Sequence, residues 1–133
     1  MTALLTTPPT AATRRSHRGT WLAFAVALVG FAVVEVARHD LGPWPILAFI
    51  MSPDLSFLAG IGAPVAKGQL ARRAVPFYNL VHRPALPLVL ITAAAFELVG
   101  PFWFVGGVSW LAHIALDRAA GYRLRTKDGW QRD

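Results

Sequence analysis

Four apolar runs, separated by short polar segments, divide the sequence. They cover approximately residues 19–37, 44–62, 75–99 and 102–120. A helix rises about 1.5 Å per residue, so roughly 20 apolar residues are enough to cross a hydrocarbon core about 30 Å thick. The pattern therefore predicts an all-α fold, a four-transmembrane-helix bundle with short loops.

The two ends of the sequence lack this apolar pattern. Residues 1–18 are rich in Thr, Pro, Ala and Arg and predict a disordered basic N-terminal tail, and residues 126–133 predict a polar C-terminal tail. The transmembrane domain is expected between them, over residues 19–125. A basic flank before an apolar run also fits a signal peptide, but this run is long and no small-residue cleavage site follows it.

Proline and glycine interrupt the apolar runs. Pro53 lies in mid-run and is followed by Asp54, an acid at a depth where ionisable groups usually face a bundle interior or a wet cavity. Pro84 and Pro87 are expected to kink the third run. Residues 63–73 contain Gly, Pro and three basic side chains, and they predict the longest loop.

Composition and charge agree with a membrane location. Hydrophobic residues make up 55% of the chain and charged residues 15%, and the mean hydropathy is +0.47. The absence of cysteine excludes disulfides and thiolate metal sites. The net charge of +6 does not indicate nucleic-acid binding, because the basic residues are not interleaved with aromatic residues along one face.

The basic residues instead indicate an orientation. Of the 13 lysines and arginines, 12 lie on one side: three before the first run, four between the second run and the first part of the third, and five from Arg118, at the end of the fourth run, onward; only Arg38 lies on the other side. By the positive-inside rule, both termini are cytoplasmic and the protein is a multi-pass protein of the cytoplasmic (inner) membrane. The expected partner is the lipid bilayer, and self-association or a protein partner in the membrane stays open.

This orientation gives each polar residue a depth. Five polar side chains fall in the cytoplasmic half of the bundle, and three antiparallel helices in a small bundle must touch. We therefore expect one polar cluster, with Arg118 beside it, made of Asp54, Asn79, His82, His113 and Asp117.

The cluster has three interpretations. The one that the sequence favours is a structural network of hydrogen bonds, because buried carboxylates are best tolerated when paired. Alternatively, Asp54, His82, His113 and Asp117 could bind a divalent metal such as zinc, manganese or iron, with Asp117 the candidate catalytic base of a membrane-embedded hydrolase. A proton or solute pathway is the third, although a transporter is less favoured because no inverted repeat is evident.

A second polar group is predicted at the opposite surface. Glu35 and Glu97 approach the outer interface as an outer-side pair, with Arg38 and His39 close by. Because Glu35 and His39 are four residues apart, this group is most simply a capped helix end. Tyr78, like several tryptophans, is expected to be an interfacial anchor.

Three segments together resemble a known family. They are Pro53-Asp54-Leu55-Ser56, Tyr78-Asn79-Leu80-Val81-His82 with Pro87 after it, and residues 110–118 followed by Gly121-Tyr122. Over about residues 20–125 the chain resembles domain of unknown function 4260, a family of small bacterial integral-membrane proteins. The resemblance implies a four-helix membrane fold and brings no activity with it. The Pro-Asp and His-x-x-x-Asp elements are more loosely similar to membrane-bound metal-dependent hydrolases.

Overall fold

The computed structural model describes residues 11–133, and these residues are helical with irregular connections. No strand forms within them, apart from one isolated bridge between Arg125 and Gln131. The prediction of an all-α fold is confirmed. The elements are α1 (Ala11–His39), α2 (Trp44–Met51), the 3₁₀ helix η1 (Ser52–Gly60), α3 (Val75–Val81), α4 (Ala85–Ala95) and α5 (Pro101–Ala120).

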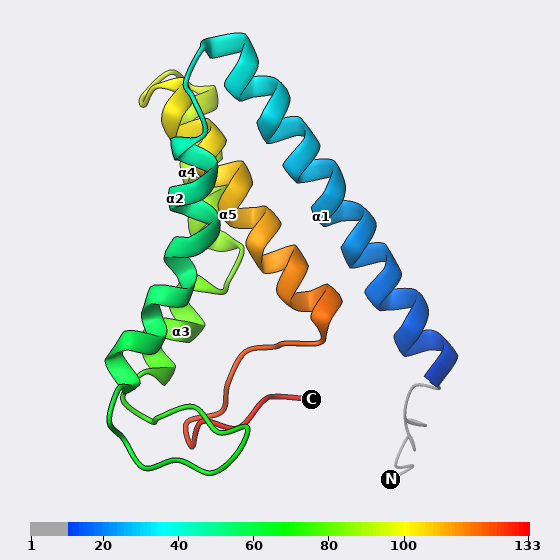
Figure 1. Cartoon of the computed structure of the whole chain (residues 1–133), viewed down its shortest axis with the longest axis vertical. Helices are drawn as coiled ribbons and strands as arrows, with labels where there is room; N and C mark the ends of the chain where they lie inside the picture. The colour runs from blue at the N-terminus through cyan, green and yellow to red at the C-terminus, as the bar shows by residue number, and fades with distance from the viewer. Residues whose placement is uncertain (1–10) are drawn as a thin grey trace, which may run out of the picture.

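Helix α5 lies at the centre of the molecule. It packs along α1 on one side and against α2 and α4 on the other, as Figure 1 shows. Nine of its residues are buried, from Val105 to Ala115. Its core contact with α1 joins Val105 and Val108 to Ala32. The remaining elements are therefore arranged around the fourth apolar run.

Helix α1 begins earlier than the sequence predicts. Residues 11–18 are helical, so the prediction of a disordered tail is wrong for them, and the rest of that predicted tail lies outside the described residues. The segment contains few helix breakers after residue 10, and it continues the helix that the apolar run begins. As a result, the basic side chains of this segment are carried on a regular helix.

The second and third apolar runs are each broken. The second run changes from α2 to η1 at Ser52, next to Pro53. In the third, α3 ends at Val81 and α4 begins after Pro84. Proline has no N–H to continue a helical ladder, which explains both breaks. Within residues 11–133, four continuous spanning helices are therefore not observed, and the third run is divided into two helices rather than only kinked.

Only α1, within the described part of the chain, is by itself long and apolar enough to cross a membrane. The combined stretch Trp44–Gly60 is apolar but shorter. Most side chains along α1 face outward, since only Ala25, Ala32 and Glu35 are buried. An outward apolar surface of this length indicates association with a membrane.

The C-terminal segment folds onto the connection between η1 and α3. The Leu70 N–H donates to the Gly129 carbonyl at 2.9 Å, and an ion pair joins Arg72 to Asp128 at 2.8 Å. The Arg125 side chain donates to the Gly68 carbonyl at 2.9 Å. Residues predicted to form a separate polar tail thus close the end of the bundle beneath α3 (Figure 1).

Candidate metal centre

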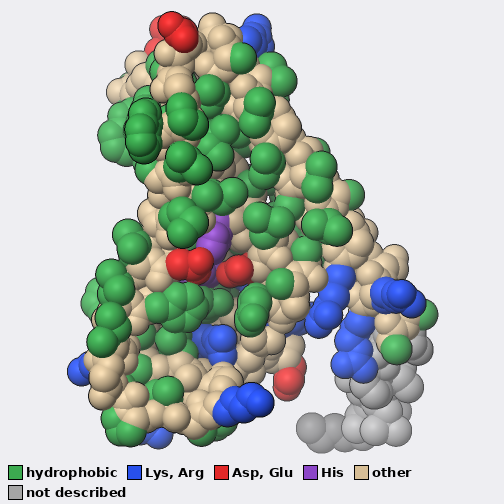
Figure 2. Space-filling view, viewed as in Figure 1, with side chains coloured by type: hydrophobic (Ala, Val, Ile, Leu, Met, Phe, Trp, Pro, Cys, Tyr) green, Lys and Arg blue, Asp and Glu red, His purple; other side chains and the backbone are tan. Residues whose placement is uncertain are grey.

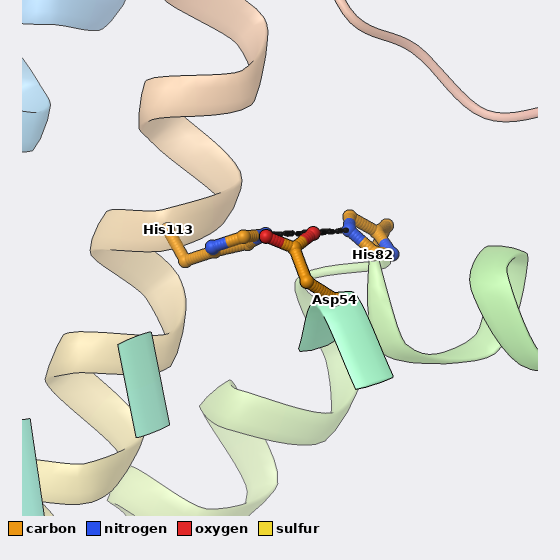
Figure 3. Close-up of side chains that lie close together, drawn as sticks. All are labelled: Asp54, His82 and His113. Carbon is orange, nitrogen blue, oxygen red and sulfur yellow. Dashed lines mark hydrogen bonds and ion pairs between the residues drawn. The ribbon is translucent and has the colours of Figure 1, made fainter. Parts of the chain in front are cut away.

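Three elements bring four ionisable side chains together near the middle of the bundle. Asp54 lies in the first turn of η1, just after Pro53. His82 is the residue that ends α3, with φ −97° and ψ 10°. His113 and Asp117 lie one turn apart on α5, so they share a face of that helix. Figure 3 shows the Asp54 carboxylate between the two imidazole rings.

The distances within this group are similar to one another. The two Nε2 atoms of His82 and His113 are 3.3 Å apart. From Asp54 Oδ1, His113 Nε2 lies at 3.5 Å and His82 Nε2 at 3.8 Å. From Asp117 Oδ2, the corresponding distances are 3.7 Å and 3.4 Å. Each carboxylate is therefore nearly equidistant from both histidines.

The imidazole-to-carboxylate separations are longer than good hydrogen bonds, the two Nε2 atoms are within hydrogen-bond distance of each other, and all of these separations fit ligands around one ion. A hydrogen bond from an imidazole N–H to a carboxylate oxygen spans about 2.7–3.2 Å. Ligand atoms about 2.1 Å from a tetrahedral zinc ion lie roughly 3.4 Å from one another. The ligand atoms of Asp54, His82 and His113 all fall within 4.8 Å of one another. The arrangement can therefore hold a divalent metal.

The backbone fixes which nitrogen of His82 faces the centre. His82 Nδ1 lies 2.9 Å from the Tyr78 carbonyl, and since a carbonyl only accepts, Nδ1 carries the proton and donates it. The ring also stacks on the Tyr78 ring, with centroids 3.9 Å apart. The neutral His82 side chain then presents the Nε2 lone pair toward His113, the arrangement that holds metal-binding histidines in place.

The four side chains of the centre differ in how far they are exposed to solvent. The side chains of His82 and His113 are 2% and 9% exposed, Asp117 is 22% exposed and Asp54 is 49% exposed. On the face drawn in Figure 2, acidic side chains lie at the surface with histidine recessed behind them. The centre therefore has a closed histidine side and an open carboxylate side, through which a small molecule could approach.

A family model matches residues 20–132, and its description is domain of unknown function (DUF4260). The chain belongs to this family. No curated protein and no solved structure matches the chain. The match includes all four side chains of the centre, and the resemblance seen in the sequence is confirmed.

Two residues predicted for the cluster have other partners. Asn79 binds the backbone of Arg125 through both ends of its amide, donating to the carbonyl at 2.9 Å and accepting from the N–H at 2.7 Å. Arg118 donates to the carbonyls of Tyr122 and His82 at 2.9 Å and 3.5 Å. Within residues 11–133, neither contacts a carboxylate of the centre, so the cluster in this family member is smaller than predicted.

Tyr78 has a role that the sequence pattern did not predict. It was expected to be an interfacial anchor, but its side chain is buried and supports His82 through the ring stack and the backbone carbonyl. The signal was the four-residue spacing of the two residues, which places a carbonyl one helical turn before the imidazole. Arg125, over the outer face of the Tyr78 ring at 5.6 Å, completes this support.

The two acids of the predicted outer-side pair have different surroundings in the structure. The Glu35 carboxylate binds Arg38 at 3.1 Å and His39 at 3.4 Å, all on α1. Glu97 is exposed in the turn after α4, with φ 59°, and no ion pair or hydrogen bond joins it to Glu35 among the residues described. Glu35 therefore pairs at the end of its own helix, as its spacing to His39 predicts.

Proposed function

We propose that this member of the family is a multi-pass protein of the cytoplasmic membrane with both termini inside. In this arrangement α1 and α5 are continuous crossings, while α2 with η1 and α3 with α4 are broken crossings. The distribution of basic residues supports this orientation, because only Arg38 lies at the opposite end. Broken helices are tolerated at membrane depth where they are buried in protein or line a wet site.

Reporter fusions test the proposed topology. A reporter that is active only outside the cytoplasm should give a signal when fused after Asp40 and none when fused after Asp133. The physical reason is the energetic cost of carrying the basic segments across the membrane. A matched cytoplasmic reporter should give the reverse result. The same signal at both positions would show that an even number of crossings separates them, where the proposal requires three, and would overturn the proposal.

We further propose that the centre binds one divalent metal through Asp54, His82 and His113. The observation that carries this proposal is the spacing of 3.3–3.8 Å among nitrogen and carboxylate atoms. A satisfied hydrogen-bond network, which the sequence favoured, would draw the same atoms closer together. The fixed tautomer of His82 supports the metal, because a metal ligand must offer an unprotonated nitrogen.

The chemistry that this arrangement supports best is hydrolysis. A bound metal supplies a water activated at neutral pH and polarises a carbonyl or phosphoryl oxygen. Asp117, next to both histidines but outside the compact set of three ligands, is placed to act as general base. The half-exposed Asp54 marks the open side, where substrate enters.

Analysis of the metal bound to the purified protein tests this proposal directly. Protein purified without chelators should contain about one equivalent of zinc, manganese or iron. His82→Gln and His113→Gln should each lose it, because glutamine cannot replace an imidazole ligand, and metal-dependent hydrolysis of a p-nitrophenyl ester should disappear with it. His39→Gln, a matched change at the far end of α1, should keep both the bound metal and the hydrolytic activity.

Other outcomes of the same measurements would contradict the metal centre or the hydrolytic role. A parent protein without metal, even after incubation with each ion, would overturn the metal centre. If His82→Gln and His113→Gln then kept parental thermal stability, the structural network would be the correct interpretation. A parent that binds metal but hydrolyses neither p-nitrophenyl acetate nor p-nitrophenyl phosphate would keep the metal centre and contradict the hydrolytic role.

A further inference from the structure

A second site lies between the start of α1 and the end of α5. A cavity of about 570 Å³ opens there, lined on one side by residues of the first turns of α1 and on the other by the last turn of α5 and the C-terminal segment. Figure 2 shows basic side chains gathered around this hollow. The metal centre does not use this cavity, and no residue of the compact ligand set lines it.

The lining is strongly basic. Five arginines contribute to it, against one acidic residue, Asp133. No carboxylate within residues 11–133 forms an ion pair with any of the five, whereas Arg38 and Arg72 do have such partners. The five are Arg14, Arg18, Arg118, Arg123 and Arg132. Arg118 and Arg132 also donate to backbone carbonyls, which leaves their charge without an ion-paired carboxylate in the described part of the chain. Several guanidinium groups around one cavity favour an anion, and their planar forked donors match the oxygens of a phosphate.

The backbone at the end of α5 leaves space for one of these five arginines. Gly121 ends α5 with φ 94°, a conformation that side-chain-bearing residues rarely adopt. A Cβ at this position would overlap the Arg18 guanidinium. The absent side chain therefore lets Arg18 reach across from α1 to the end of α5, and it brings the two halves of the cavity together.

The position of the cavity indicates which phosphate-bearing molecule can reach it. Trp21 also lines it, and from Trp21 onward α1 is apolar and largely exposed. The cavity therefore lies where the basic part of α1 meets its membrane-facing part, at the depth of lipid headgroups. We propose that this cavity binds the phosphate of an anionic phospholipid headgroup. The proposal uses the proposed membrane orientation but not the metal centre.

Lipid binding to the purified full chain tests this inference. The protein, in detergent micelles, is titrated with phosphatidylglycerol and with phosphatidylcholine, and bound lipid is counted by native mass spectrometry. Phosphatidylglycerol should bind at least about tenfold more tightly, since the zwitterionic headgroup also brings a cation. Arg14→Gln combined with Arg18→Gln should weaken phosphatidylglycerol binding by about tenfold.

A matched control separates a built site from general charge attraction. Arg15→Gln combined with Lys67→Gln removes the same charge from residues that do not line the cavity, and it should leave binding within about twofold. Equal loss in both double variants would overturn the site. Binding of inorganic phosphate without any preference for phosphatidylglycerol would overturn the lipid as its source. Metal content, measured on the same samples, should stay parental, so the two proposals can fail separately.

Discussion

Helices α1 and α5 each carry one buried ionisable side chain, but the two side chains are accommodated differently. On α1, Glu35 finds both partners on its own helix, Arg38 three residues later and His39 four residues later. On α5, His113 reaches His82 from the end of α3 and Asp54 from η1, besides Asp117 on its own helix. The first arrangement is local and paired, and the second depends on the tertiary fold.

This difference separates a helix cap from a candidate site. The partners of Glu35 are solvent-exposed, with side-chain exposures of 69% and 45%, and one acid meets one guanidinium group and one imidazole. Around His113, both carboxylates lie at 3.5–3.7 Å, too far for good hydrogen bonds, and the His82 imidazole is within hydrogen-bond distance at 3.3 Å. Bringing such groups together without a cation costs free energy, so the arrangement on α5 supports the proposed metal, whereas the arrangement on α1 needs no ligand to explain it.

Replacing the buried group on each helix should give the largest contrast. We expect His113→Ala to lower the free energy of unfolding by about 2–4 kcal/mol, because it empties a buried volume and removes a ligand. Glu35→Gln should cost less than about 1 kcal/mol, because both ion-pair partners are exposed and the amide keeps an acceptor oxygen. Thermal unfolding in detergent, followed by circular dichroism, measures both.

A chelator sharpens the same contrast. If a bound metal stabilises the centre, chelation should lower the melting temperature of the parent and of Glu35→Gln, because a ligand that binds only the folded state stabilises it. The same treatment should leave His113→Ala unchanged. Similar losses of stability in His113→Ala and Glu35→Gln, with no chelator effect in either, would remove the distinction between the two helices.

The sequence was sufficient for the parts that depend on local pattern. Apolar runs predicted the helical fold, and helical spacing predicted the contacts of Glu35 with His39 and of His113 with Asp117. The predicted depths also grouped Asp54 and His82 with His113 and Asp117, and the structure brings the four together. In each case, the prediction required only that neighbouring segments be helical and antiparallel.

The sequence was insufficient where the chain leaves the helix. Asn79 and His82 are three residues apart, so a continuous helix would point both into the cluster. Because α3 ends at Val81, His82 leaves the helical path and Asn79 binds the Arg125 backbone instead. Pro84 predicts an interruption of the third run, but the partner of Asn79 lies 46 residues away, and helical periodicity carries no information about that contact.

The contrast between the helices also requires that α5 be held more tightly than α1, and one glycine on each helix tests this. A Cβ at Gly107 on α5 would lie 2.8 Å from Ile91 Cγ1 and 3.2 Å from the Pro87 carbonyl oxygen, so Gly107→Ala must push α4 away. We expect a loss of about 1–3 kcal/mol in the free energy of unfolding.

Gly30 on α1 is the matched control, since a Cβ there meets nothing within 4 Å. Gly30→Ala should be neutral or stabilise the protein by up to about 1 kcal/mol, because alanine is the better helix former. Since α4 follows directly from the segment that carries His82, Gly107→Ala should also reduce bound metal, while Gly30→Ala should not. Thermal unfolding and metal analysis of the two variants measure both effects. If Gly107→Ala matched Gly30→Ala in both measurements, α5 would not be the fixed helix against which the candidate centre is built.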